Sequence, residues 1–176
     1  MNIEIIQYTE VDGIRTVPDS RIKALYEQTV EDGTCESVFC DGTVQSADQF
    51  LNAVKYGESV MGLWMQDDKV IGFSWCNRFQ NHTAQGHFCA FKRAWGEGTV
   101  EAGRMIVRQW LNFKDKNGNY VFDLITGLIP AFNTHAVQYI ERCGATIMGE
   151  IPNIIWHSKE QKSIPGVSIY FQRGDV

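Results

Sequence analysis

The sequence has 176 residues, of which 44% are hydrophobic and 21% charged, and this composition is that of an ordinary globular protein rather than a disordered chain. Its formal net charge of −5, its pI near 5.3 and the lack of any run of lysine or arginine argue against binding to nucleic acid or to an anionic membrane. We therefore expect a single domain over residues 1–176, with neither kind of partner.

The cysteines and the N-terminus bear on the cellular compartment. The five cysteines are an odd number without the Cys-x-x-Cys or histidine-rich spacing of a zinc site, so buried thiols and no bound metal are expected. The N-terminus lacks the basic and apolar regions of a signal peptide, and no apolar stretch is long enough to span a bilayer. These features favour a cytoplasmic protein.

The first half of the chain is expected to contain a strand, two helices and then three strands. A helix is predicted from Ser20 to just before Gly33, and the capping-box pattern Ser46-x-x-Gln49 marks the start of a second helix. Apolar runs rich in aromatic and β-branched residues predict strands at residues 3–8, 59–65, 69–77 and 86–91, of which the second and third form a hairpin.

The second half is expected to continue with a helix at residues 99–113, where apolar residues recur at helical spacing. A nearly continuous apolar run at 120–129 is typical of a central strand. A short helix at 133–143, ended by Gly144, and two closing strands at 145–150 and 167–172, joined by a polar loop, complete the chain. The order is β, α, α, β, β, β, α, β, α, β, β, which places the chain in the α/β (α+β) class.

A glycine-rich turn, Arg93-x-x-Gly96-x-Gly98, lies between the fourth strand and the helix that follows it. Two glycines allow the backbone to turn tightly and to approach a ligand closely. The first amides of the following helix lack partners within the helix, and such a terminus favours a phosphate. Taken alone, the pattern fits a strand-to-helix turn without a ligand equally well.

The element order, with this turn after the fourth strand, resembles that of the GNAT superfamily of N-acyltransferases over nearly the whole chain. Arg93-x-x-Gly96-x-Gly98 has the residue types and spacing of the loop that binds the acyl-CoA pyrophosphate in that family. Three other segments are similar to family motifs: residues 67–73 to the hairpin leading into the third strand, Asn133-x-x-Ala136 to the start of the fourth helix, and Gly144-Ala145 to a Gly-Phe pair.

The resemblance implies a mixed, mostly antiparallel sheet of six to seven strands, flanked by about four helices and splayed between its fourth and fifth strands. Acetyl-CoA would occupy the gap as co-substrate. A primary amine, on a small molecule or a protein, would attack the thioester directly in a ternary complex, and the rate would come chiefly from positioning. A homodimer is one assembly state that the resemblance leaves open.

The resemblance also implies which residues bind acetyl-CoA. Amides of the turn and of the helix N-terminus would hold the pyrophosphate, while the backbone of the fourth strand would pair with the pantetheine arm. The cofactor-binding residues implied in this way are Phe91, Arg93, Gly96, Gly98, Thr99 and Asn133. Asn133 is predicted equally well as the N-cap of the helix that follows it.

The sequence departs from the family pattern at the general acid. Family members usually carry a tyrosine four residues after the alanine of the fourth helix, and here that position is Ile140. Tyr139 comes one residue earlier and points about 100° away around the helix. It is the candidate acid, although packing as an aromatic residue is the favoured interpretation. His135 and Cys143 are further candidates, better explained as a surface imidazole and a core thiol.

The charges around the turn leave the sign of the local field open. Glu97 and Glu101 lie where they would oppose a bound pyrophosphate, although the helix dipole favours acidic residues there. Lys92, Arg93 and Arg104 could offset them.

His87, on the fourth strand, is the candidate general base, because an imidazole titrates near neutral pH and can accept a proton from an amine. It is explained as well by a half-buried strand residue that is hydrogen-bonded to the protein. Asp123, on the fifth strand, is the second candidate, and a buried carboxylate would need a partner there.

Two readings of function therefore follow from the sequence. The first is an acetyl-CoA-dependent N-acyltransferase, favoured by the intact turn residues Arg93, Gly96 and Gly98. The second is a catalytically degenerate structural or assembly protein of the same fold, as in phage or prophage head assembly, favoured by the missing tyrosine and the acidic turn. A dinucleotide-binding protein is a weaker third class, because the glycines do not follow the first strand of a βαβ unit.

Overall fold

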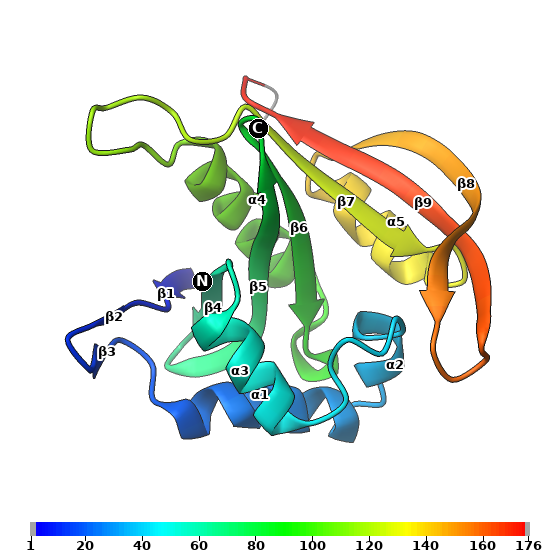
Figure 1. Cartoon of the computed structure of the whole chain (residues 1–176), viewed down its shortest axis with the longest axis horizontal. Coiled ribbons are helices and arrows are strands. Elements are labelled where there is room, and N and C mark those ends of the chain that lie inside the picture. Colours follow the sequence, from blue (N-terminus) through cyan, green and yellow to red (C-terminus); the bar gives the residue numbers. More distant parts are fainter. Residues whose placement is uncertain (1–2, 175–176) are drawn as a thin grey trace.

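Seven strands form one large sheet in the computed structural model, which describes residues 3–174 apart from the side chain of residue 97 (Figure 1). The strands are β1 (Ile3–Gln7), β4 (Val60–Gln66), β5 (Lys69–Gln80), β6 (Thr83–Ala90), β7 (Leu124–Pro130), β8 (Thr146–His157) and β9 (Lys162–Gln172). Their order across the sheet is β1-β4-β5-β6-β7-β9-β8, and every neighbouring pair except β6 and β7 is antiparallel. The expected mixed, mostly antiparallel sheet is confirmed.

The helices are α1 (Asp19–Glu31), α2 (Cys35–Val38), α3 (Ala47–Tyr56), α4 (Glu97–Leu111) and α5 (Thr134–Arg142), with a single 3-10 turn η1 (Lys92–Ala94) and a small hairpin of β2 (Glu10–Val11) and β3 (Ile14–Arg15). The capping box begins α3 as predicted, because the Ser46 hydroxyl accepts a hydrogen bond from the Gln49 amide at 3.2 Å. Within residues 3–174, no helix is long and apolar enough to span a membrane.

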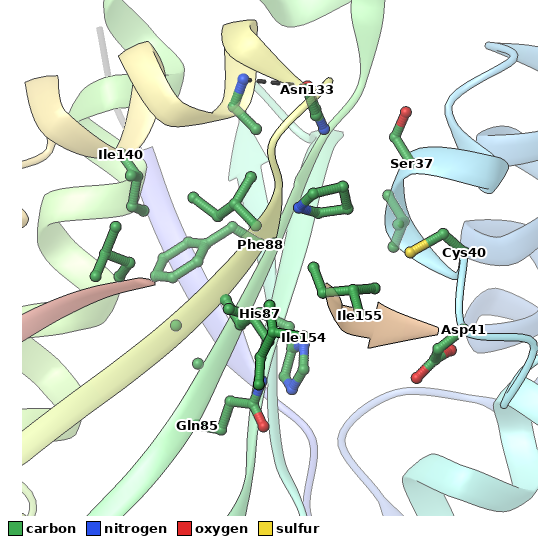
Figure 2. Close-up of a pocket in the computed structure, with 18 of the residues that line it drawn as sticks. Ser37, Cys40, Asp41, Gln85, His87, Phe88, Asn133, Ile140, Ile154 and Ile155 are labelled. Atoms are coloured by element: carbon green, nitrogen blue, oxygen red, sulfur yellow. Dashed lines mark hydrogen bonds between the residues drawn. The ribbon is translucent and has the colours of Figure 1, made fainter. Parts of the chain in front are cut away.

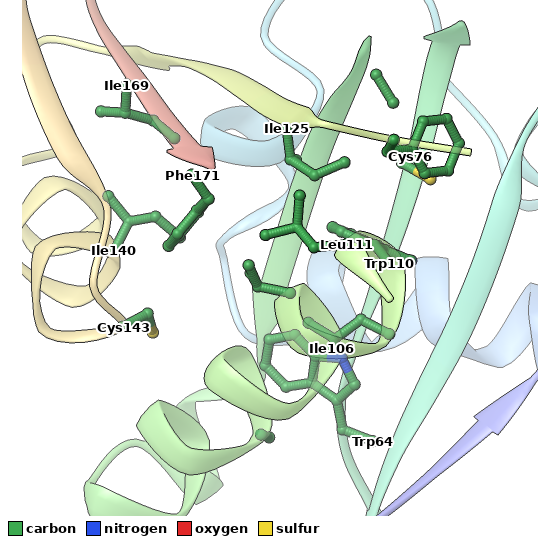
Figure 3. Packing of buried hydrophobic residues seen from close by; sticks show 14 of the residues in the cluster. Trp64, Cys76, Ile106, Trp110, Leu111, Ile125, Ile140, Cys143, Ile169 and Phe171 are labelled. Carbon is green, nitrogen blue, oxygen red and sulfur yellow. The ribbon is translucent and has the colours of Figure 1, made fainter. Parts of the chain in front are cut away.

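Hydrophobic clusters cover both faces of the sheet. On one face, Trp64 and Ile125 of the sheet pack with Ile106 and Trp110 of α4, and α5 extends this cluster through Ile140 (Figure 3). The other face packs against α1 and α3. There, Phe73 and Phe91 contact each other and join Phe50, Ile22 and Leu25 of the two helices. Burial on both faces explains why the central strands read as nearly continuous apolar runs.

The sheet splits between β6 and β7. The two strands pair in parallel only where Thr83–Gln85 lies beside Leu124–Thr126. Beyond this short register β6 runs on to Ala90 and β7 to Pro130, and the strands separate (Figure 1). Adjacency at one end and divergence at the other agree with the expected splay. The separated lengths leave backbone groups that need other partners.

The C-terminal hairpin is longer than the sequence predicts. The expected polar loop between residues 150 and 167 is instead mostly strand, because β8 and β9 stay paired from Thr146–Tyr170 out to His157–Lys162. β8 is an edge strand, so Pro152 interrupts it without disrupting a central ladder. The register between β8 and β9 shifts between Ile151 and Ile155, and a bulge there accommodates the residues between them, which include Pro152.

Two other strand boundaries also differ. β5 and β6 meet at a tight turn of Asn81 and His82, with φ values of 47° and 61°, so β6 begins three residues before the predicted strand. β7 begins at Leu124 rather than near residue 120, because the Asp115 carboxylate accepts hydrogen bonds from the Asn117 and Asn119 amides and closes a separate loop.

We expect Gly103→Val to destabilise the protein by about 1–3 kcal/mol, the usual range for overpacking a core. Gly103 lies in α4 against α5, and a Cβ there would collide with the Tyr139 hydroxyl and lie 2.6 Å from the Cys143 sulfur. Chemical denaturation measures the change, with Gln109→Val on the exposed side of α4 as the matched control. A free energy of unfolding equal to that of the control would contradict this packing.

Candidate active site

Two cavities lie where β6 and β7 separate. The loop cavity, about 500 Å³, lies between the turn before α4 and the start of α5. The sheet cavity, about 470 Å³, lies between β6, β7, α2 and β8. Both are lined by Ser37, Val38, Phe88, Asn133, Ala136 and Tyr139, so the two cavities adjoin at these residues. A ligand entering by the loop cavity can therefore reach a second molecule in the sheet cavity.

The glycine-rich turn forms one wall of the loop cavity. Gly96 has φ 151° and ψ −163°, a conformation that is essentially restricted to glycine. A Cβ at this position would contact nothing within 4 Å, so backbone conformation rather than space requires the glycine. Gly98 is the second residue of α4. Thr99 is buried in the first turn of α4, where its hydroxyl donates a hydrogen bond to the Gly96 carbonyl at 2.8 Å.

Two basic side chains line the loop cavity. Lys92 and Arg142 line it, and no aspartate or glutamate does so among the side chains that the structure describes. Glu101 lies outside the cavity lining and pairs with Arg104 at 3.8 Å and with Arg108 at 3.9 Å. The side chain of residue 97, the other expected acidic group, lies outside the described residues. The α4 N-terminus adds its own positive dipole end.

The side chains of Arg93 and Phe91 lie outside both cavities. The Arg93 guanidinium donates to the Gln28 side chain at 2.5 Å and to the Val70 carbonyl at 2.9 Å, and it lies over the Phe91 ring. Phe91 is fully buried, and its amide donates to the Ile71 carbonyl at 3.0 Å. These two residues therefore fix the turn to α1 and β5 rather than facing a ligand.

Asn133 is both the N-cap of α5 and a lining residue of the cavities, the two places expected for it. Its side-chain oxygen accepts a hydrogen bond from the Ala136 amide at 3.2 Å, so it is the N-cap of α5 (Figure 2). The same residue lines both cavities. The side-chain oxygen of Asn133 is thus bonded to the helix, while its side-chain nitrogen has no hydrogen bond within the described residues.

Tyr139 packs between α4 and α5, as the helical geometry predicts. Its hydroxyl donates to the Thr99 carbonyl at 2.9 Å, and burial, with the neighbouring Cys143, raises its pKa well above the usual value. Burial also raises the pKa of Cys143 to about 11. Ile140, at the position where the family carries its tyrosine, is buried in the core (Figure 3). His135 stacks against the half-exposed ring of Trp95 beside the loop cavity.

His87 lies in the wall of the sheet cavity. Its ring stacks on Trp75 with centroids 4.5 Å apart, and its Nε2 lies 3.0 Å from the Asn77 side-chain oxygen. Burial, and secondly the positive charge of Arg78, lower the pKa of His87 to about 4, although Asp41 opposes the shift. The imidazole is therefore neutral at pH 7. Its other nitrogen, Nδ1, is the acceptor when Nε2–H donates to Asn77.

Asp123 lies away from the site. It comes just before β7, and its carboxylate pairs with the Arg173 guanidinium at 2.7 Å. Arg173 also lies over the Tyr120 ring. Asp123 lines neither cavity, so its carboxylate is held by a structural partner.

Several lining residues carry no sequence signal. Ser37 and Asp41 belong to or follow the four-residue helix α2, which has no motif, and Arg78 lies just beyond the predicted end of its strand. Ile154 and Ile155 lie in the stretch expected to be a loop. Among the described side chains, no group of three or more His, Cys, Asp or Glu residues is arranged to hold a metal ion.

No protein-family model matches the sequence, and no curated protein matches it. Solved structures of acetyltransferases nevertheless match the fold over almost the whole chain. An aminoglycoside acetyltransferase in complex with coenzyme A and kanamycin has a TM-score of 0.69 at 12% identity, covering 98% of this chain and 95% of that chain.

Two further structures match similarly. The ribosomal-protein-S5-alanine acetyltransferase from Vibrio fischeri has a TM-score of 0.68 at 10% identity, covering 98% of this chain and 94% of that chain. Spermidine N-acetyltransferase from Vibrio cholerae, in complex with CoA and spermine, has a TM-score of 0.64 at 12% identity, covering 97% and 96%. The chain therefore has the GNAT acetyltransferase fold, and at these identities the likeness is one of fold alone.

We expect stability to fall as the pH falls from about 6.5 toward 4, because the unfolded chain protonates His87 over this range and the folded chain does not. The loss attributable to His87 between pH 7 and pH 4.5 is about 2–3 kcal/mol. His87→Phe keeps a ring against Trp75. Chemical denaturation should show that its free energy of unfolding falls by that much less than the wild type's between pH 7 and pH 4.5. Between pH 7 and 8.5 the two proteins should change in parallel. Equal losses at low pH would contradict the shifted pKa.

Proposed function

We propose that the protein is an acetyl-CoA-dependent N-acyltransferase that transfers the acetyl group directly to a primary amine in a ternary complex. The observation that carries the proposal is the split between β6 and β7, which opens two adjoining cavities, one of them beside the Gly96 turn. One cavity suits a long anionic co-substrate and the other suits an acceptor. The structural neighbours solved with coenzyme A give this proposal further support.

In the proposed complex, the pyrophosphate lies at the amides of Gly96, Gly98 and Thr99, where the α4 dipole and the Lys92 ammonium favour a negative group. The pantetheine arm follows the separated length of β6, whose backbone groups there have no partner on β7. The Ala90 carbonyl is already taken by the Trp95 indole N–H at 3.0 Å. Phe91 donates its amide to β5, and the alternation along the strand turns Cys89 to β5 as well, so the backbone of Phe88 and the Asn133 side chain are the nearest partners for the arm.

The thioester lies where the two cavities meet. The amine nitrogen forms a bond to the acetyl carbon, the bond from that carbon to sulfur breaks, and the proton lost by nitrogen ends on the coenzyme thiolate. His87 is a weak base with its pKa near 4, so proton removal by it contributes little driving force. The acceptor therefore reacts as the free amine, with positioning as the main source of rate.

Replacement of Gly96 by valine should weaken acetyl-CoA binding at least tenfold, because valine disfavours φ 151° and the turn must change shape. Gly118→Val is the matched control, since Gly118 also has positive φ and open space around it but lies in the loop after α4. Isothermal titration measures affinity, and thermal unfolding shows whether both variants lose similar stability. Equal affinity of Gly96→Val and the control would remove the phosphate-turn interpretation.

Tyr139→Phe should change the rate of acetyl transfer by less than about tenfold, or 1.4 kcal/mol of barrier. The reason is that the Tyr139 hydroxyl donates to the Thr99 carbonyl and is not available to protonate sulfur. A positioned general acid would contribute 10²-fold or more. Steady-state kinetics with Tyr56→Phe, at an exposed position, as the control distinguishes these outcomes.

The alternative, a structural or assembly protein without catalysis, has less support because two adjoining cavities are present at the split in the sheet. It becomes the better explanation if the purified protein neither binds acetyl-CoA nor acetylates any amine in a broad panel.

A further inference from the structure

The sheet cavity contains one charged side chain of each sign. Arg78 and Asp41 line it, and the rest of its described lining is neutral, including the Trp75–His87 stack and the β8 residues Ile154 and Ile155. Both charged groups act electrostatically on His87, in opposite directions. An acceptor bearing several positive charges would need several carboxylates around it, and this cavity supplies one.

Arg78 is placed in the cavity by an unusual backbone. Its φ of 53° lies in the left-handed region, which a residue other than glycine seldom adopts. The register between β5 and β6 shifts between Asn77 and Gln80, and such bulges redirect side chains. Among the side chains that the structure describes, none forms a hydrogen bond or ion pair with the Arg78 guanidinium, and the residue is exposed. A charge held in this way is available to a ligand.

Asp41 is less available than Arg78. One of its carboxylate oxygens accepts hydrogen bonds from the Thr43 amide at 3.1 Å and the Thr43 hydroxyl at 2.8 Å. Asp41 thereby shapes the loop after α2, on the side of the cavity facing β6 (Figure 2). Asp41 keeps its negative charge but is oriented by Thr43, whereas no described side chain pairs with the Arg78 guanidinium, so Arg78 is the charged group of this cavity that is best placed to bind a ligand.

The distance from Arg78 to the reaction centre follows from the strand register. Phe88 and Gln85 both line the sheet cavity (Figure 2). Phe88 also lines the loop cavity and so marks the place where the two meet, whereas Gln85 lies opposite Asn77, which precedes Arg78 in the sequence. Three residues of β-strand separate Phe88 from Gln85, which is roughly 10 Å. The cavity between these points is lined largely by apolar and aromatic side chains.

We propose that the acceptor is a primary amine that carries an anionic group roughly 10 Å from its nitrogen across an apolar spacer, with Arg78 binding that group. This inference rests on the proposed function and names the substrate class of the same site. It separates this protein from neighbours whose structures contain the polyamine spermine or the aminoglycoside kanamycin.

Three amines of matched length test the proposal: 8-aminooctanoate, octylamine and 1,8-diaminooctane, which end in a carboxylate, a methyl group and a second ammonium. With saturating acetyl-CoA, kcat/KM should be at least tenfold higher for 8-aminooctanoate than for 1,8-diaminooctane. In Arg78→Gln, the ratio of kcat/KM for 8-aminooctanoate to that for octylamine should fall at least tenfold. Arg78→Glu should favour the diamine, and Arg108→Gln, on α4 outside both cavities, is the matched control.

Titration calorimetry with coenzyme A present provides a second measurement that needs no turnover. The wild type should bind 8-aminooctanoate at least tenfold more tightly than Arg78→Gln does. Acetylation of all three amines with no effect of Arg78→Gln would overturn the substrate class while leaving the acyltransferase function intact. Absence of acetylation together with carboxylate-specific binding would overturn the transfer function and support the site. Equal binding of the three amines overturns the inference in either case.

Discussion

The separation of β6 from β7 is the constraint on which the rest of the structure depends. A sheet that parts leaves backbone hydrogen-bonding groups exposed in its middle, and these must be satisfied by solvent or by a ligand. Here the gap opens beside the α4 N-terminus, which is itself short of partners. Two sets of unsatisfied groups therefore face the same space, and an extended, anionic, hydrogen-bonding molecule meets the needs of both.

The side chains around the gap divide into those that fix the backbone and those that are free. Arg93, Tyr139 and Asn133 each commit a polar group to a neighbouring segment, so they hold the turn, α4 and α5 in place. Lys92 and Arg78 also line the cavities, and among the described residues neither side chain has a hydrogen bond or an ion pair. This division explains why positioning accounts for the proposed chemistry better than a strong acid or base does. Each cavity is thus lined by at least one cation, Lys92 in the loop cavity and Arg78 in the sheet cavity.

Much of the architecture could be predicted because its signals are local. The capping box at Ser46 and the Asn133 N-cap were each predicted correctly from a few residues, and the apolar run at 120–129 contains most of β7. The paired stretch of β8 after Ile151 could not, because an edge strand tolerates polar residues and proline. In the site, too, local features could be predicted and features that depend on distant segments could not. Periodicity placed Tyr139 correctly, whereas the role of Arg78 depends on a bulge and on segments distant in sequence.

The two hydrogen bonds of Arg93 have a consequence for local unfolding. They join the turn before α4 to Gln28 of α1 and to Val70 of β5, which are far apart in the sequence. A segment tied in this way opens together with its anchor, so the turn and the end of α1 should exchange their amide hydrogens as one cooperative unit. Occupation of the loop cavity would then slow hydrogen exchange in α1, although α1 itself forms no part of the cavity wall.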